Sequence, residues 1–118
     1  MSNVLDMILT KELIEAPLTV NSDYESEMVD ITNREDEFSF QTIYDNGSSV
    51  NMSISLELSS DGVNFSEVTD SAQVITDANG SDLIDVYGTG ANYARVKITV
   101  VAGSIDIQRI VYSAKRRH

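Results

Sequence analysis

The chain has 118 residues, a length that suits one domain with a core of its own. It contains no cysteine, so neither a disulfide framework nor a thiolate metal site is available to it. Its net charge is −11, and eighteen of its nineteen acids lie in residues 1–90. This distribution predicts that most of the surface repels nucleic acid and anionic lipid, so neither is expected as a partner.

Residues 2–15, "SNVLDMILTKELIE", carry the clearest helical signal of the chain. Leu5, Leu9 and Leu13 recur at a spacing of four, and Pro17 ends whatever structure precedes it. The segment is interpreted as a short helix, a first strand, or an arm (residues 1–16) that becomes ordered against a partner. It lacks the basic start and apolar core of a signal peptide, and no run approaches the roughly 20 apolar residues of a membrane span.

After Pro17 the apolar residues recur with a period close to two, which is typical of half-buried strands in an antiparallel sheet. Stretches 38–44, 50–59 and 93–101 all alternate in this way. The clearest places Val50, Met52, Ile54, Leu56 and Leu58 on one face. A last stretch starts with Ile105 and Ile107 inward and changes phase at Arg109–Ile110, which predicts a β-bulge or a strand buried on both faces.

Turn-forming residues separate these stretches. Residues 45–49, "DNGSS", contain Asn-Gly, the strongest short hairpin signal, and Asp61-Gly62 is predicted to supply the positive-φ positions of another turn. Further glycine-containing turns are expected near residues 79, 88–90 and 103. The pattern predicts an all-β fold, an antiparallel two-sheet β-sandwich over residues 17–114. Phe65, just after the turn at 61–62, is expected to close one end of the core.

Catalytic signals are weak in this chain. Its one histidine, His118, is the last residue, and no Gly-X-Ser-X-Gly motif or phosphate-binding loop is present. We therefore predict no enzymatic activity. Calcium is an alternative at one loop, because hard oxygen ligands gather around a glycine, but the spacing lacks a full calcium-binding loop and the same residues suit a plain hairpin. No metal or other cofactor is expected. The residues of that loop are Asp77, Asn79, Asp82 and Asp85.

Two segments carry a family resemblance: "SLELSSDGVNF", residues 55–65, and "YARVKIT", residues 93–99, followed by a Gly-Ser turn at 103–104. With the segments around them, over roughly residues 12–114, they resemble small β-sandwich virion structural proteins of tailed phages and prophages. The same two pieces resemble, more weakly, discoidin-type jelly-roll domains, although Lys97 stands where such domains often have arginine. These resemblances imply a jelly-roll-like sandwich and a structural role in a virion.

The function predicted on this basis is that of a non-enzymatic virion structural protein assembled in the host cytoplasm. It would serve as a capsid decoration or cement protein, or as a head–tail or tail component. It would act by subunit assembly, as a homo-oligomer and against other virion proteins such as the major capsid protein. The arm and the basic tail, residues 115–118, are the expected contact regions, and a solvated or packed terminus is the alternative for each. The predicted contact residues are Leu5, Ile8, Leu9, Lys115, Arg116 and Arg117.

A second prediction belongs to another class of protein, a carbohydrate-binding β-sandwich module used, for example, in host attachment. Its candidate ligand-binding residues are Tyr87, Tyr93 and Arg95, which lie near predicted turns at one end of the sandwich. The chain has no tryptophan, the usual platform for a sugar ring, and this weakens the carbohydrate-binding interpretation.

Overall fold

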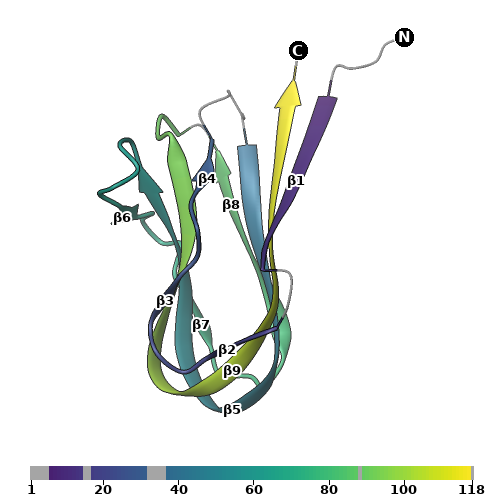
Figure 1. Ribbon diagram of the computed structural model, residues 1–118, viewed down its shortest axis with the longest axis vertical. Coiled ribbons are helices and arrows are strands. Elements are labelled where there is room, and N and C mark those ends of the chain that lie inside the picture. The colour runs from purple at the N-terminus through teal and green to yellow at the C-terminus, as the bar shows by residue number, and fades with distance from the viewer. Residues whose placement is uncertain (1–5, 15–16, 32–36, 88, 118) are drawn as a thin grey trace.

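The computed structural model describes residues 6–14, 17–31, 37–87 and 89–117, and in these ranges every regular element is a β-strand (Figure 1). The strands form one antiparallel sheet, and the all-β antiparallel class predicted from the sequence is confirmed. They are β1 (Asp6–Ile14), β2 (Leu18–Val20), β3 (Tyr24–Glu25), β4 (Val29–Asp30), β5 (Glu37–Ser59), β6 (Ser66–Glu67), β7 (Gln73–Ile75), β8 (Gly80–Tyr87) and β9 (Tyr93–Arg117). The described residues contain no helix long and apolar enough to cross a membrane.

Two long strands, β5 and β9, organise the fold. They pair with each other from Glu37↔Lys115 to Ser59↔Tyr93 and bend together about midway, so that the sheet folds over itself into two facing limbs (Figure 1). In limb A the order is β1–β9–β5–β8, with residues 37–45 and 106–117 of the long strands. In limb B residues 93–100 of β9 carry β3 and β4, and residues 52–59 of β5 carry β6 and β7. This arrangement is compatible with a sandwich, although the limbs are continuous rather than two separate sheets. The narrower term jelly-roll stays a prediction.

The core fills the space between the limbs, because alternate residues of both long strands point inward. Phe40 of limb A and Leu56, Val96 and Ile98 of limb B are at most 1% exposed and belong to one buried cluster. The aromatic rings of Phe38, Phe40 and Tyr112 pack together, with centroids 5.3–6.0 Å apart. The period-two prediction for these stretches is confirmed. The exceptions lie in β5, where Ser55 and Ser59 of the predicted polar face are buried and Leu58 is half-buried.

The hairpin predicted at residues 45–49 is wrong, because the chain runs on through this segment as part of β5. Positive φ angles at Asn46 and Ser49, with several register shifts against β9, bend the strand instead of reversing it. The predicted break at residue 103 is likewise a bend within β9. Gly103 has φ 86°, and an added Cβ would lie 2.3 Å from the Ser49 carbonyl oxygen. Asn46 and Ser49 therefore adopt positive φ angles here. Because β5 stays paired with β9 on both sides of this segment, the chain bends instead of reversing.

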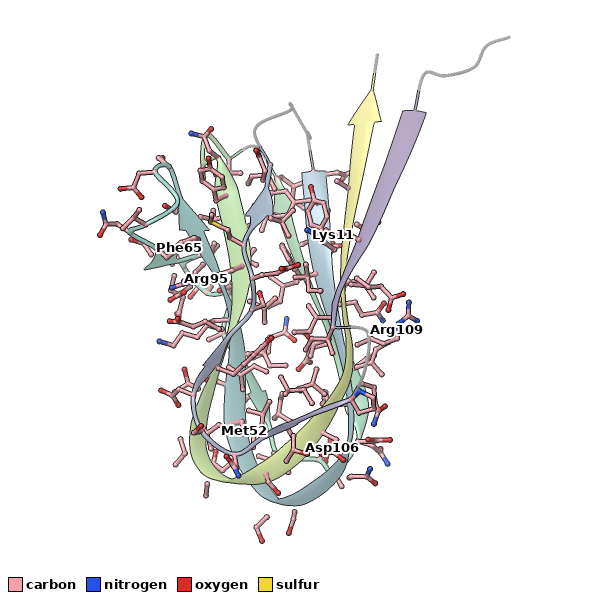
Figure 2. All side chains as sticks on the ribbon, in the orientation of Figure 1. Lys11, Met52, Phe65, Arg95, Asp106 and Arg109 are labelled. Carbon is pink, nitrogen blue, oxygen red and sulfur yellow. The ribbon has the colours of Figure 1, made fainter. Side chains whose placement is uncertain are left out.

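Side chains also hold this bend. The Asp106 carboxylate accepts hydrogen bonds from the Thr19 hydroxyl, at 2.6 Å, and from the Asn46 side-chain amide, at 3.1 Å. These two donors hold the pKa of the Asp106 carboxyl below its usual range. One exposed carboxylate thus links β2 and β5 to β9 at the closed end of the molecule, where Figure 2 shows it.

The phase change predicted at Arg109–Ile110 is a β-bulge, as one of the two interpretations states. Ile43 pairs with Arg109 and Tyr44 pairs with Ile107, so Gln108 is the extra residue in β9. The bulge shifts the inward positions by one residue. As a result both Ile107 and Ile110 are fully buried.

The N-terminal segment is a strand in this structure, and the helical interpretation is wrong. Residues 6–14 form β1, which pairs with residues 110–117 of β9 from Asp6↔Arg117 to Ile14↔Ile110. The described residues of the predicted arm and of the predicted basic tail therefore belong to two paired strands of the sheet. The spacing of four that suggests a helix also fits a strand, because residues four apart in a strand lie on the same face. The register against β9 shifts between Glu12 and the buried Ile14.

Candidate assembly surface

The β1–β9 ribbon places most of the predicted contact residues side by side. Ile8 pairs with Lys115, Leu9 pairs with Ala114, and Met7 pairs with Arg116. Leu5 lies outside the described residues. Among the described residues, the pairing of β5 with β9 ends at Glu37↔Lys115, whereas β1 stays paired with β9 as far as Asp6↔Arg117. The β1–β9 ribbon reaches past the neighbouring described strands (Figure 1). The role of these contact residues in assembly stays a prediction.

Among the described strands β1 pairs only with β9, so its other edge is a sheet edge. An unpaired strand edge presents backbone N–H and C=O groups that a further strand can pair with. Lys11 of β1 forms an ion pair with Glu27 of limb B at 3.5 Å, so this contact joins the two limbs. Both side chains are more than half exposed, so this ion pair contributes little to the free energy of unfolding.

The outer face of limb B, which points away from limb A, carries a compact polar cluster around Arg95. Its Nε donates to Glu57 Oε1 at 2.8 Å, its Nη2 donates to Glu25 Oε2 at 3.2 Å, and its guanidinium lies 3.9 Å from the centroid of the Phe65 ring. Lys97 adds a longer contact of 3.8 Å to Glu25. The Glu57 side chain is only 12% exposed, so its charge depends on Arg95. The Arg95 guanidinium is thus engaged by two carboxylates and one aromatic ring of the same chain.

The prediction that Phe65 closes one end of the core is wrong. Phe65 is half-buried and lies over Arg95 on the outside of the sheet (Figure 2). Residues 55–65 and 93–99, which carry the family resemblance, meet at this contact. Sequence analysis missed the contact because it depends on the register of strands that lie far apart in the chain. A signal for it is the placement of Glu57 and Arg95 on the polar faces of their strands.

The turn before Phe65 is held by its own side chains. Asp61 Oδ1 accepts hydrogen bonds from the backbone amides of Val63 and Asn64, both at 2.8 Å, and Ser59 Oγ accepts from the Gly62 amide at 2.9 Å. The bonds from Asn64 and Val63 hold the pKa of the Asp61 carboxyl well below its usual range. Of the predicted Asp-Gly pair, only Gly62 has a positive φ, 79°. The motif "SSDGVNF" is thus explained as a self-capped turn that delivers Phe65 to Arg95.

The outer face of limb A is different, because short hydroxyl side chains leave a depression of about 240 Å³ there. Ser39 pairs with Asp85 on one side and with Ser113 on the other, while Glu37 pairs with Tyr87 in the adjacent row. These five residues line the depression, and Tyr87 is 69% exposed. Hydroxyl groups, carboxylates and one exposed aromatic ring form a surface able to contact a polar partner.

The structure separates the residues of the carbohydrate-binding prediction. Tyr93 and Arg95 lie two residues apart on the same side of β9 in limb B, whereas Tyr87 lies on the outer face of limb A. The guanidinium of Arg95 is already engaged by Glu57 and Glu25. Tyr93 is half-buried against the turn, where its ring lies 3.3 Å from the position that a Cβ on Gly62 would take. A binding role for these residues stays a prediction.

The loop considered for calcium does not gather its carboxylates. Asp82 faces inward opposite the buried Thr42, whereas Asp85 lies on the outer face of the same strand. Burial raises the pKa of the Asp82 carboxyl, whose Oδ2 accepts no hydrogen bond from the described residues. Burial, together with the charge of Asp82, also raises the pKa of Tyr44. Within the described ranges, no group of three or more histidine, aspartate or glutamate side chains is placed to hold a metal ion.

Comparison with known proteins gives matches of fold alone. The SPBc2 prophage-derived protein YomS is similar over 98% of this chain and 99% of its own, with a TM-score of 0.59 and 14% identity. A chain from the disulfide-linked pili of Bacillus endospore appendages matches 99% of this chain and 94% of its own, with a TM-score of 0.56 and 12% identity. The enzymatically active domain of bacteriophage CBA120 tailspike protein 4 matches 97% of this chain with 18% of its own, at a TM-score of 0.58 and 12% identity.

No protein-family model matches the sequence, and no curated protein matches it. Among the solved structures, the resemblance to phage proteins inferred from the sequence agrees with the similarity in fold to a prophage-derived protein and to a phage tailspike domain.

Proposed function

We propose that this chain is a non-enzymatic structural protein of a tailed-phage virion that acts by subunit assembly. Within that class it would serve as a capsid decoration or cement protein, or as a head–tail or tail component. The observation that carries the proposal is the end-to-end match in fold with a prophage-derived protein, which covers 98% of this chain and 99% of the other. The similarity in fold to a pilus chain, which covers 94% of that chain, supports an assembling role.

Two features of the described residues support assembly as the mechanism. The sheet ends in an edge strand, β1, in a ribbon that reaches past its neighbours, and strand edges are common sites of pairing between chains. The outer face of limb A presents the exposed large side chains of Leu83 and Tyr87. Contacts through edges and outer faces leave the shared core intact, and a subunit present in many copies needs such contacts.

The test is to locate the protein on particles. Virions from the phage or lysogen that encodes the chain would be purified on a density gradient, and the chain quantified by mass spectrometry in each fraction. We expect many copies per particle in the virion band, and loss of the signal when a stop codon replaces an early codon of the gene. Recovery of the chain only in the soluble fractions, with normal particles, would contradict the proposal.

Glycan binding, for example in host attachment, is a second candidate, favoured by the depression beside Tyr87. An exposed aromatic ring next to carboxylates and hydroxyls is the chemistry that binds a sugar by stacking and hydrogen bonds. A glycan array with the wild-type chain and the Tyr87→Ala variant tests it, with Tyr93→Phe as a control on the other limb. Binding that Tyr87→Ala alone abolishes would support the glycan site, and absence of binding on the array would reject it.

A further inference from the structure

The chain contains the same three-residue sequence, Asn-Gly-Ser, in two different structural settings. One copy is residues 46–48, within β5, and the other is residues 79–81, where β8 begins. Asn-Gly is a chemically labile pair, because glycine has no Cβ that would shield its backbone nitrogen from the preceding side chain. Since the two triplets are the same in sequence, a difference in their reactivity in the folded chain comes from the surrounding structure.

The reaction of such a pair in water is an attack within the chain. The glycine backbone nitrogen loses its proton and bonds to the side-chain carbonyl carbon of the asparagine, and the side-chain nitrogen takes up a proton and leaves as ammonia. Water then opens the resulting five-membered imide at one of its two carbonyl carbons, which gives aspartate or isoaspartate. The attack needs a backbone nitrogen and a side chain that are both free to reach the reacting geometry.

Hydrogen bonds hold both reacting groups of the first triplet. The backbone nitrogen of Gly47 donates to the Ala78 carbonyl oxygen at 2.9 Å, and the side-chain amide of Asn46 donates to Asp106 Oδ2 at 3.1 Å. The backbone is also closely packed here, because a Cβ on Gly47 would lie 2.8 Å from the Ala78 Cα. The fold therefore restrains the nucleophile and the side chain of this triplet together.

The second triplet begins in the exposed loop between β7 and β8. Asn79 and Gly80 are both exposed, and the Asn79 side chain forms no hydrogen bond with the described residues. Gly80 pairs with Tyr44, and this pair is the last of the ladder between β5 and β8. Strand ends open more easily than strand centres, so this triplet reaches the reacting geometry at a lower cost.

The Asp61-Gly62 pair provides a third case, since aspartate forms the same imide with loss of water. Its groups are held as those of the first triplet are. The backbone nitrogen of Gly62 donates to Ser59 Oγ at 2.9 Å, and Asp61 Oδ1 accepts hydrogen bonds from two backbone amides of the turn. Of the three labile pairs, the one at residue 79 is thus the pair whose side chain no described residue holds.

From this contrast we propose that Asn79 is a site of self-modification in the folded protein, converted to aspartate and isoaspartate through an imide with Gly80, while Asn46 is protected. The product adds a negative charge to a loop that already carries Asp77, in a chain whose net charge is −11. A more acidic form of the chain therefore accumulates with time. The inference concerns the chemistry of this loop and holds whether or not the chain assembles.

The experiment follows both triplets in the same full-length chain. The folded protein and the protein unfolded in urea are incubated in mildly alkaline buffer made with heavy-oxygen water, which marks the carboxylates that form during the incubation. Peptide mapping by mass spectrometry gives the conversion rate at Asn46 and at Asn79. Two variants are compared with the wild type after circular dichroism establishes that they are folded. Asp106→Ala removes the acceptor of the Asn46 side chain, and Thr19→Ala is the matched control, because it removes only the other hydrogen bond of the same carboxylate.

In the folded chain we expect conversion at Asn79 to be at least about tenfold faster than at Asn46, and in urea the two rates should be similar. Asp106→Ala should speed conversion at Asn46 and leave Asn79 unchanged, whereas Thr19→Ala should change neither rate. Conversion at Asn79 that is no faster than at Asn46 in the folded chain would overturn the inference. An Asn46 rate that Asp106→Ala does not raise would contradict the protection assigned to this hydrogen bond.

Discussion

Two arginines on β9 form the same bond in different surroundings. Arg95 in limb B and Arg109 in limb A each donate through Nε to a glutamate Oε1 at 2.8 Å. The Arg95 and Glu57 side chains are 21% and 12% exposed, whereas the Arg109 and Glu12 side chains are 51% and 43% exposed. Figure 2 shows the two arginines on opposite sides of the molecule. Distance alone does not therefore decide which pair stabilises the fold.

The same contrast extends to the whole outer faces of the limbs. In limb B, Arg95 is engaged by carboxylates and by Phe65, and the turn at Asp61 is capped by its own side chains. Limb A leaves Tyr87, Leu83 and the acids around the depression open to solvent. The polar cluster of limb B is thus closed, although Val63 and Val74 of that limb are exposed, whereas the face of limb A around Tyr87 is open. The open face and the β1 edge are the parts of limb A suited to contacts with other molecules.

The largest effect is expected at the bend that both limbs share. Gly103→Ala would place a Cβ 2.3 Å from the Ser49 carbonyl oxygen, at a φ of 86° that a non-glycine residue adopts only with strain. We expect the free energy of unfolding to fall by roughly 3–5 kcal/mol, from backbone strain and overpacking together. Chemical denaturation measures it.

Gly90→Ala is the matched control, because nothing lies within 4 Å of the position that its Cβ would take. Equal stability of Gly103→Ala and Gly90→Ala would show that the bend does not need a glycine.

The second prediction compares how much each of the two arginines contributes to the free energy of unfolding. Arg95→Ala leaves the nearly buried Glu57 without its cation and uncovers the Phe65 ring, so we expect a loss of about 2 kcal/mol. Arg109→Ala removes an exposed pair and should cost less than about 0.5 kcal/mol. Urea titrations of both variants give the comparison, and similar losses would mean that burial does not distinguish the pairs.

Local sequence patterns predicted much of the fold. Alternation identified the inward residues of both long strands, and the change of phase at Arg109–Ile110 located the bulge at Gln108. These features depend on neighbours one or two residues away, so a single sequence contains them.

Features set by the partner strand were predicted less well. The pair Asn46-Gly47 is typical of a hairpin turn. Because β9 continues alongside this segment, the chain bends there instead of reversing. The leucine spacing of β1 fits a helix equally well, and only its pairing with the end of β9 excludes the helix. The Phe65–Arg95 contact requires the register of β5 against both β6 and β9, and the spacing of residues within one strand does not contain that register.

A smaller effect depends on pH and compares the two faces of β8. Burial raises the pKa of Asp82 in the folded chain, so the folded state holds this proton more tightly than the unfolded state. The contribution of Asp82 to stability therefore falls as pH rises from its ordinary pKa of 3.8 through the raised value. We expect Asp82→Asn to raise the melting temperature near neutral pH, and this gain to shrink at about pH 3.

Asp85→Asn is the control for this measurement, because it removes the same charge from the exposed face of the same strand. Thermal melts of both variants at the two pH values separate burial of the carboxylate from a general loss of negative charge. An equal gain for both variants would assign the effect to net charge alone.

The smallest effect on stability is expected at Tyr87, the aromatic residue of the open face. Phe65 packs on Arg95, whereas the Tyr87 side chain is 69% exposed and belongs to no buried cluster. Tyr87→Ala should therefore change the free energy of unfolding by no more than about 0.5 kcal/mol, while Phe65→Ala should cost about 1 kcal/mol through the lost cation–π contact. If Tyr87→Ala keeps its stability but loses assembly or glycan binding, the open face of limb A is a binding surface. If it loses stability as Phe65→Ala does, Tyr87 is part of the packing and the two outer faces are equivalent.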